Sequence, residues 1–322
     1  MPARLRSLLA SGLPQLIASV RERSGSIDAA VQNRAVESPA AGGTVEEQLS
    51  QLQKDVASLR ALVIAQNEHA QRKLRASLSS AVNLISLLPH LKIDGVLPPF
   101  SHLGWEITGE LAAFLFHLIR RRRPKLVFEL GSGSSTILFA AALRANGMGR
   151  VISVEHDPEH RRRTAQFLQD TELSDWAALV ETPLVEQRFG SLDLQWYDLD
   201  PLLRGMSETI DILFVDGPPG RIQPLSRYPA LPVLKPHLSE QAIVLVDDGR
   251  RDDEMRMVEL WRELDISFDV EPLSFLPRSP LLLTVPANPN WIAELRRAGD
   301  RGTVVWENDP DVAPADRRGG SS

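Results

Sequence analysis

The chain contains no cysteine among its 322 residues. Disulfides, thiolate zinc sites, thiolate-held iron–sulfur clusters and a cysteine nucleophile are therefore excluded. No apolar run approaches the 18 or more residues of a membrane-spanning helix, so we expect no membrane span. The formal net charge of −6 argues against general nucleic-acid binding, which needs a basic surface. The first 20 residues resemble a signal peptide poorly, because Gly12 and Pro14 break their apolar stretch, and we expect a cytoplasmic protein.

The length predicts one domain of roughly 200 residues with appendages, or two domains. Residues 1–43 are expected to be a weakly ordered leader and linker, because termini are often weakly ordered and residues 24–43 are rich in Ser, Ala and Gly without a lasting hydrophobic period. Residues 44–90 are expected to form a helical arm, because apolar residues recur there at alternating four- and three-residue steps. The residues of this seam are Val45, Leu49, Leu52, Val56, Leu59 and Val63. A seam this short needs a partner, either a second copy of the chain in a homo-oligomer or the chain's own globular domain.

Residues 91–288 are expected to form the main domain, and residues 289–322 a tail. Short apolar runs without alternation indicate strands that are covered on both faces, and hence a parallel sheet. The strand candidates are Lys125–Leu130, Val151–Glu155, Ala178–Glu181, Ile210–Val215 and Ala242–Val246. The helix candidates are Trp105–Arg123, Ser134–Ala145, Pro158–Gln169 and Arg251–Leu264. Two later strands, near 268–273 and 281–285, are closely linked and should pair antiparallel, so we expect a doubly wound, Rossmann-like α/β fold.

A glycine-containing turn follows the first expected strand, with the sequence ELGSGSST at residues 129–136. Gly131 and Gly133 allow a tight turn and a close backbone approach, and the next helix opens at Ser134, where free N–H groups attract an anion. The second strand ends at Glu155, whose carboxylate can accept hydrogen bonds from two ribose hydroxyls. Asp157 before Pro158 is expected to cap the following helix. A nucleoside that carries an anionic group is the implied ligand.

Two cofactors compete for this site. A dinucleotide fingerprint has a third glycine where this chain has Thr136, which counts against NAD. In S-adenosylmethionine (SAM), a charged amine lies beside a carboxylate, so that Glu129 would lie near the amine and the helix amides near the carboxylate. SAM is therefore the expected cofactor, and an NAD-dependent oxidoreductase is the alternative.

Four motifs in order resemble the bacterial class I SAM-dependent methyltransferases of the methyltransferase-24-like family. They are ELGSGSST, VEHD, DILFVDGPPG with RYPALP, and IVLVDDGR, and the resemblance covers about residues 88–286. The resemblance implies a seven-stranded sheet with the last strand antiparallel. The chain departs from the pattern of the broader class at Ser135, where many members carry a third glycine. The expected cofactor-binding residues are Glu129, Gly131, Ser132, Gly133, Ser134, Ser135, Glu155 and Asp216. The residue that recognises adenine is not evident, and a catalytically inactive assembly protein with this fold is a further alternative.

Three carboxylates should converge after the fourth and fifth strands, at Asp216, Asp247 and Asp248. Hard oxygen ligands of this kind suit Mg²⁺ or another divalent cation. The arrangement is similar to that of metal-dependent O-methyltransferases of the catechol type, although Asp248 replaces an amide. The alternative is that Asp216 faces the methionine end of SAM while Asp248 caps the next helix.

Methyl transfer to a hydroxyl needs alignment and a base, for which Asp216 and His156 are the candidates. His156 is otherwise a structural residue or a wall of the SAM pocket. The expected acceptor is a hydroxyl of a glycan or small metabolite. Arg227 and Tyr228 either line its site or form a turn. The aromatic residues Trp105, Trp196 and Tyr197 are either a sugar platform or core.

Overall fold

The computed structural model describes residues 50, 53–54, 57–58, 60–71, 87 and 107–286. The chain divides into two compact units, Met1–Gln71 and Arg72–Ser322. In the first unit, residues 60–71 are helical and exposed. Of the expected seam, only Val63 belongs to the described part, and the leader and the tail from residue 287 lie outside it. No helix in the described residues is long and apolar enough to cross a membrane.

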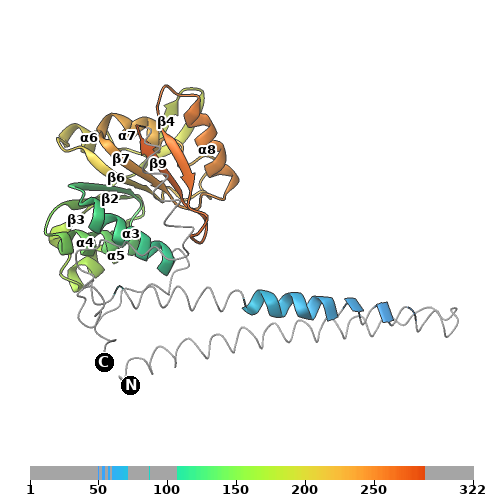
Figure 1. Cartoon of the computed structure of the whole chain (residues 1–322). Helices are drawn as coiled ribbons and strands as arrows, with labels where there is room; N and C mark the ends of the chain where they lie inside the picture. Colours follow the sequence, from blue (N-terminus) through green and yellow to red (C-terminus); the bar gives the residue numbers. More distant parts are fainter. Residues whose placement is uncertain are drawn as a thin grey trace, which may run out of the picture. The chain divides into compact units, whose positions relative to one another are not determined.

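The second unit is built on a seven-stranded sheet (Figure 1). Across the sheet, its strands follow the order β3 (Ala177–Glu181), β2 (Arg150–Glu155), β1 (Leu126–Leu130), β6 (Ile210–Val215), β7 (Leu238–Val246), β9 (Leu281–Val285) and β8 (Asp269–Pro272). The ladders from β3 through β7 are parallel, whereas β9 runs antiparallel to both of its neighbours. The strand order reverses between β1 and β6, and an open α/β sheet binds its ligands at such a point, beyond the carboxyl ends of the strands.

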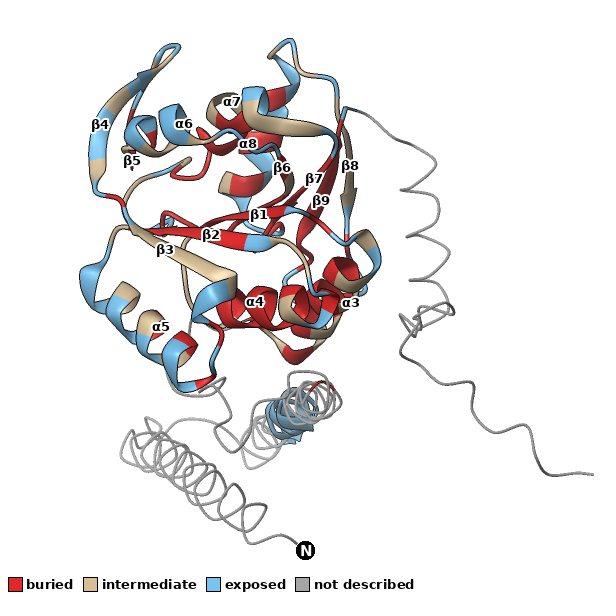
Figure 2. Cartoon of the chain, turned by 90° about the vertical axis from the view of Figure 1, so that its left-hand side faces the viewer, coloured by how far each residue is buried: buried red, intermediate tan, exposed pale blue. Residues whose placement is uncertain are grey.

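Helices cover both faces of this sheet (Figure 2). One face packs against α3 (Gly109–Arg122), α4 (Ser134–Asn146) and α5 (Pro158–Asp170), followed by the short turn η1 (Ser174–Trp176). The other carries α6 (Asp200–Gly205), α7 (Ala230–Leu234) with η2 (Lys235–His237), α8 (Asp252–Arg262) and a hairpin of β4 (Leu184–Phe189) and β5 (Leu192–Tyr197). The sheet is therefore covered on both sides, as its uninterrupted apolar strands predict.

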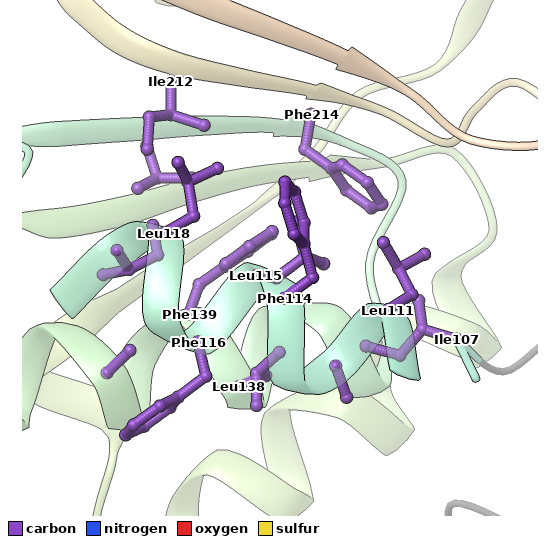
Figure 3. Packing of buried hydrophobic residues seen from close by; sticks show 14 of the residues in the cluster. Ile107, Leu111, Phe114, Leu115, Phe116, Leu118, Leu138, Phe139, Ile212 and Phe214 are labelled. Atoms are coloured by element: carbon purple, nitrogen blue, oxygen red, sulfur yellow. The ribbon is translucent and has the colours of Figure 1, made fainter. Parts of the chain in front are cut away.

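Alternation along the strands divides the core into two layers. In β1, Val127 faces the α3–α4 layer, while Phe128 faces the layer of α6–α8. Figure 3 shows the first layer, in which Leu115 of α3 lies under the sheet near Phe214 of β6. Phe139 of α4 meets Phe214 edge to face, with ring centroids 5.5 Å apart. This packing fixes α4 against the centre of the sheet, where the first turn of the helix enters the site.

The expected strands and helices of the main domain are confirmed, with shifts of a few residues at their ends. The hairpin β4–β5 was not expected. It explains why the sugar-platform interpretation is wrong for Trp196 and Tyr197: both are fully buried at the end of β5, in the core layer with α6–α8. Trp105 lies outside the described residues.

Candidate active site

The turn between β1 and α4 has the backbone that the sequence pattern predicts. Gly131 and Gly133 have φ angles of +106° and +149°, a region that side chains other than glycine rarely adopt. No side chain caps α4 at Gly133. The first amides of α4 are thus available for an anion. From the far side, His160 Nε2 lies 2.8 Å from the carbonyl oxygen of Ser132 and holds the turn in place.

Glu129 lies underneath this turn rather than on its open side. Its side chain is fully buried and accepts hydrogen bonds from the hydroxyls of Ser135, Ser153 and Thr136, the last at 2.6 Å. Thr136 Oγ1 in turn accepts a hydrogen bond from the backbone N–H of Gly133 at 3.0 Å. Glu129 therefore holds the glycine turn through Thr136, and its contact with the amine of SAM stays a prediction.

Glu129 also makes the stability of the domain depend on pH. Burial raises its pKa from 4.5 to about 7, against the hydrogen bonds from the three hydroxyls, which lower it. Between pH 4.5 and about 7, Glu129 keeps its proton in the folded chain but has lost it in the unfolded chain, so the free energy of unfolding falls as the pH rises. We expect the free energy of unfolding, relative to Glu129→Gln, to fall by about 1 kcal/mol between pH 6 and 8. Urea unfolding of both proteins at the two pH values measures this, and parallel pH dependences would contradict it.

Glu155 ends β2 with an ionised carboxylate at the edge of the turn. It is 4% exposed and accepts hydrogen bonds from the backbone N–H groups of His156 (2.9 Å) and Asp157 (3.0 Å) and from Ser132 Oγ (3.1 Å). Burial acts to raise the pKa of Glu155, but the His156 ring and the N–H of Asp157 outweigh it, and the pKa lies below its ordinary value. A carboxylate that is charged at neutral pH is suited to accept hydrogen bonds from ribose hydroxyls.

His156 belongs to the same corner of the site. Its Nδ1 lies 3.0 Å from Glu155 Oε1, outside hydrogen-bond geometry, and its ring meets Tyr197 edge to face. These contacts favour a pocket-wall role over that of a base, although the base assignment stays a prediction. Asp157 caps α5 as expected, accepting hydrogen bonds from the N–H groups of Glu159 and His160.

The three expected carboxylates converge after β6 and β7. One oxygen each of Asp216, Asp247 and Asp248 can be chosen so that all lie within 4.8 Å of one another. Asp248 does not cap the next helix, which corrects that alternative: α8 begins after Arg251 without a side-chain cap. Instead, Asp248 Oδ2 pairs with the Arg251 guanidinium at 2.7 Å.

A buried arginine enters the carboxylate cluster. Arg227 is 4% exposed, and its Nη2 donates to Oδ1 and to the backbone oxygen of Asp216, at 3.1 and 2.9 Å. Its Nη1 donates to the backbone oxygen of Asp247 at 2.9 Å and lies 3.2 Å from Glu254 Oε1. Arg227 therefore joins the ends of β6 and β7 from a turn before the short helix α7, which is one of the two alternatives that the sequence left open.

Burial raises the pKa of Asp216 well above its ordinary value, against the lowering effect of Arg227. Asp247 and Asp248 add to the rise, because they are negative charges nearby. The side chain of Asp216 keeps 27% of its surface exposed, compared with 2% for Asp247 and 9% for Asp248. Asp216 is therefore the most open of the three and the one best suited to accept a proton.

A cavity of about 460 Å³ adjoins this cluster. The residues that line it come from the loop after β6 and the first turns of α8: Gly220, Arg221, Leu225, Ser226, Arg227, Arg251, Asp252, Asp253, Glu254 and Met257. Charges of both signs and two apolar side chains share its walls. Arg227 lines this cavity and also binds Asp216, whereas Asp216 itself is not among the lining residues.

Two site residues have no signal in the sequence, and for a third, Tyr197, the sequence does not show the contact that it makes. His160 and Glu254 look like ordinary residues of exposed helix turns, yet His160 holds the glycine turn and Glu254 is buried beside Arg227. A Cβ atom added to Gly217 would lie only 2.4 Å from the hydroxyl oxygen of Tyr197. The hairpin thus presses on the loop after β6, where only glycine fits.

The fold is an open α/β sheet that carries a glycine turn after β1 and carboxylates at the ends of β2 and β6, at the edge where such sheets bind their ligands. Residues 128–249 match the model of a family described as a methyltransferase domain. Over these residues the chain is similar to that family, and the match indicates that the enzyme is a methyltransferase. No curated protein matches the chain.

Solved structures with a similar course of the chain include three methyltransferases. The SAH-bound methyltransferase PaMTH1 of Podospora anserina has 14% identity and a TM-score of 0.47, over 68% of this chain and 95% of that one. The O-methyltransferase of Bacillus cereus in complex with SAH has 16% identity and a TM-score of 0.40, over 63% and 90%. The SAM-bound O-methyltransferase TomG of Streptomyces achromogenes, involved in tomaymycin synthesis, has 18% identity and a TM-score of 0.41, over 64% and 90%.

Proposed function

We propose that the enzyme transfers the methyl group of SAM to a hydroxyl oxygen of a glycan or a small metabolite. The observation that carries this proposal is the position of Asp216, a partly open carboxylate with a raised pKa that lies beside Gly131 and binds Arg227 of the cavity wall. A hydroxyl acceptor must lose its proton during transfer, and a carboxylate whose pKa is raised by burial is a stronger base than an ordinary carboxylate. The cavity is large enough for a small acceptor or one terminal sugar of a glycan.

The residues of the turn fit the cofactor. SAM supplies an activated methyl group, and transfer is an in-line displacement. The positive φ angles of Gly131 and Gly133 let the backbone approach the ligand closely, and α4 offers its first amides to a carboxylate. Glu155 would hold the ribose. Asp216 would take the proton of the acceptor, and Arg227 fixes the carboxylate of Asp216 for this step.

Calorimetric titration with SAM and with its product S-adenosylhomocysteine tests the proposal. We expect one binding site per chain for each, and no heat with NAD or NADH. NAD binding without SAM binding would replace this proposal with the oxidoreductase alternative. That outcome is disfavoured because Thr136 stands where a dinucleotide fingerprint needs its third glycine. Thr136 and Ser135 both donate hydrogen bonds to Glu129 instead.

We also propose that the arm of residues 44–90 joins copies of the chain into a homo-oligomer. In support, the helical residues Leu62, Val63 and Ile64 each expose more than half of their surface, which is costly in water for three adjacent apolar side chains. Light scattering on the full chain should then give a mass above that of the monomer. Leu62→Glu with Val63→Glu should reduce this mass, and a monomeric wild type would contradict the proposal.

A further inference from the structure

We propose that the guanidinium of Arg227 takes the place that a divalent metal ion would hold among Asp216, Asp247 and Asp248, so that this enzyme needs no metal. The inference rests on the function proposed above, because it concerns the same strand ends. It replaces the expectation of a Mg²⁺ site at these three carboxylates.

The guanidinium makes the contacts that a cation at this place would make. Its two terminal nitrogens bind one carboxylate oxygen of Asp216 and the backbone oxygens of Asp216 and Asp247. They also lie 3.2 Å from Glu254 Oε1 and 3.7 Å from Asp248 Oδ2. These are oxygens from β6, β7 and α8, which one planar fork of donors joins. A metal at Asp216 Oδ1 would thus have to share that oxygen with a buried cation.

The chain on both sides of Arg227 is anchored, which keeps the side chain in place. Before it, Ser226 Oγ donates to the backbone oxygen of Pro218 at 3.1 Å. After it, the backbone oxygen of Tyr228 accepts a hydrogen bond from the indole N–H of Trp261 at 2.8 Å. The guanidinium therefore cannot leave the cluster by a rotation of the loop without breaking buried hydrogen bonds.

The surrounding charges are already nearly balanced. Besides Arg227, the described residues bring two further cations to the cluster: Arg251 lies 2.7 Å from Asp248, and Arg278 lies 3.7 Å from Asp248 and 3.8 Å from Asp247. With Asp216 and Glu254 included, three arginines face four carboxylates. A divalent ion bound at about 2.1 Å from Asp216 Oδ1 would lie within roughly 5 Å of the guanidinium, and the two cations would repel each other.

Such a substitution has a chemical consequence for the acceptor. A metal would bind the acceptor oxygen directly and lower its pKa, whereas the two terminal nitrogens of Arg227 already donate to oxygens of the protein. Deprotonation is then left to Asp216. Arg227 is a positioning residue: it holds the carboxylate of Asp216 and the ends of β6 and β7 at fixed separation.

Titration with Mn²⁺, followed by electron paramagnetic resonance and calorimetry, tests the inference. We expect no stoichiometric Mn²⁺ binding by the wild type up to 1 mM (on the order of the weakest protein sites for divalent cations), and unchanged SAM affinity with EDTA. Arg227→Met removes the resident cation and should gain one Mn²⁺ site with a dissociation constant of roughly 0.1 mM or below, tenfold under that limit. Arg256→Met is the control, because Arg256 lies on the same helix α8 but pairs with Glu259 at the surface, and this variant should gain none.

Each outcome decides the inference. One Mn²⁺ per wild-type chain, lost in Asp247→Asn, would overturn it, and so would a folded Arg227→Met protein that gains no site. If Arg227→Met does not fold by circular dichroism, Arg227→Gln takes its place, and the wild-type titration decides by itself. SAM calorimetry on the same samples separates the two proposals: SAM binding together with wild-type Mn²⁺ binding removes only this inference, whereas absent SAM binding removes the proposed function.

Discussion

Replacement of Glu155 with alanine is expected to weaken SAM binding about 100-fold. A carboxylate that accepts two hydrogen bonds from ribose contributes about 3 kcal/mol, since hydrogen bonds to charged groups contribute roughly 1.5 kcal/mol or more each. The lowered pKa of Glu155 ensures that the carboxylate is charged at neutral pH, so the effect should be constant from pH 6 to 8. Calorimetric titration of wild type and variant with SAM measures the difference.

Two further variants separate this role from a structural one. Glu181 ends the neighbouring strand β3 and pairs with Arg161 at the surface, so Glu181→Ala removes a carboxylate of the same kind and should leave SAM affinity unchanged. Glu155→Gln keeps an acceptor for the N–H groups of His156 and Asp157 but loses the charge, and should fall between wild type and alanine. Wild-type affinity in a folded Glu155→Ala protein would sink the assignment.

Asp216→Asn is expected to lower the rate of methyl transfer by about 10²- to 10⁴-fold, the usual contribution of a general base. Asparagine has the same shape and can still accept the hydrogen bond from Arg227, but it cannot take up a proton. SAM affinity should stay within about threefold of the wild type, a difference worth under 1 kcal/mol. Because burial raises the pKa of Asp216, the wild-type rate should fall as the pH drops through that raised pKa, and the variant should lack this fall.

Transfer of label from methyl-labelled SAM into a small-molecule extract provides the measurement. Asp247→Asn is the control, because it removes one negative charge from the same cluster at a residue that is 1% exposed. If the charge of the cluster mattered rather than the base, both variants would lose activity equally. A rate for Asp216→Asn within tenfold of the wild type would contradict the assignment.

Much of the domain follows from the sequence because strands covered on both faces are short and apolar. β1 and β6 are nearly continuous apolar runs, and a motif residue ends or follows each of them. The parallel arrangement then brings those strand ends to one edge, so the convergence of the glycine turn, Glu155 and Asp216 could be predicted. The antiparallel position of β9 likewise followed from its short connection to β8.

The hairpin could not be predicted in the same way. β4 lies at the surface, where Val185 is exposed and charged residues such as Glu186 and Arg188 interrupt the pattern. Its pairing with β5 depends on a turn at Gly190, which is weak as a signal alone. The burial of Trp196 and Tyr197 depends on that pairing, and for this reason their role was open.

Nor could the sequence show which charges would meet. Three aspartates after two strands predict a metal by their chemistry, but Arg227 stands 11 residues after Asp216 in a loop without regular structure. The position of Arg227 in the cluster depends on the hydrogen bonds that its neighbours Ser226 and Tyr228 make with Pro218 and Trp261. Similarly, side chains alternate along β1, and this alternation points Glu129 into the core. Its hydrogen-bond partners Ser135 and Ser153 come from α4 and β2, which the sequence alone does not bring together.

The position of β9 has a consequence for synthesis of the protein on the ribosome. β9 lies between β7 and β8, and in the described sheet β8 pairs with β9 alone. β8 therefore leaves the ribosome before the strand that it needs, and one edge of β7 stays open until Leu281–Val285 has emerged. A nascent chain stalled before Leu281 should thus be protease-sensitive at β8 and prone to edge-to-edge aggregation, although its cofactor turn is already complete.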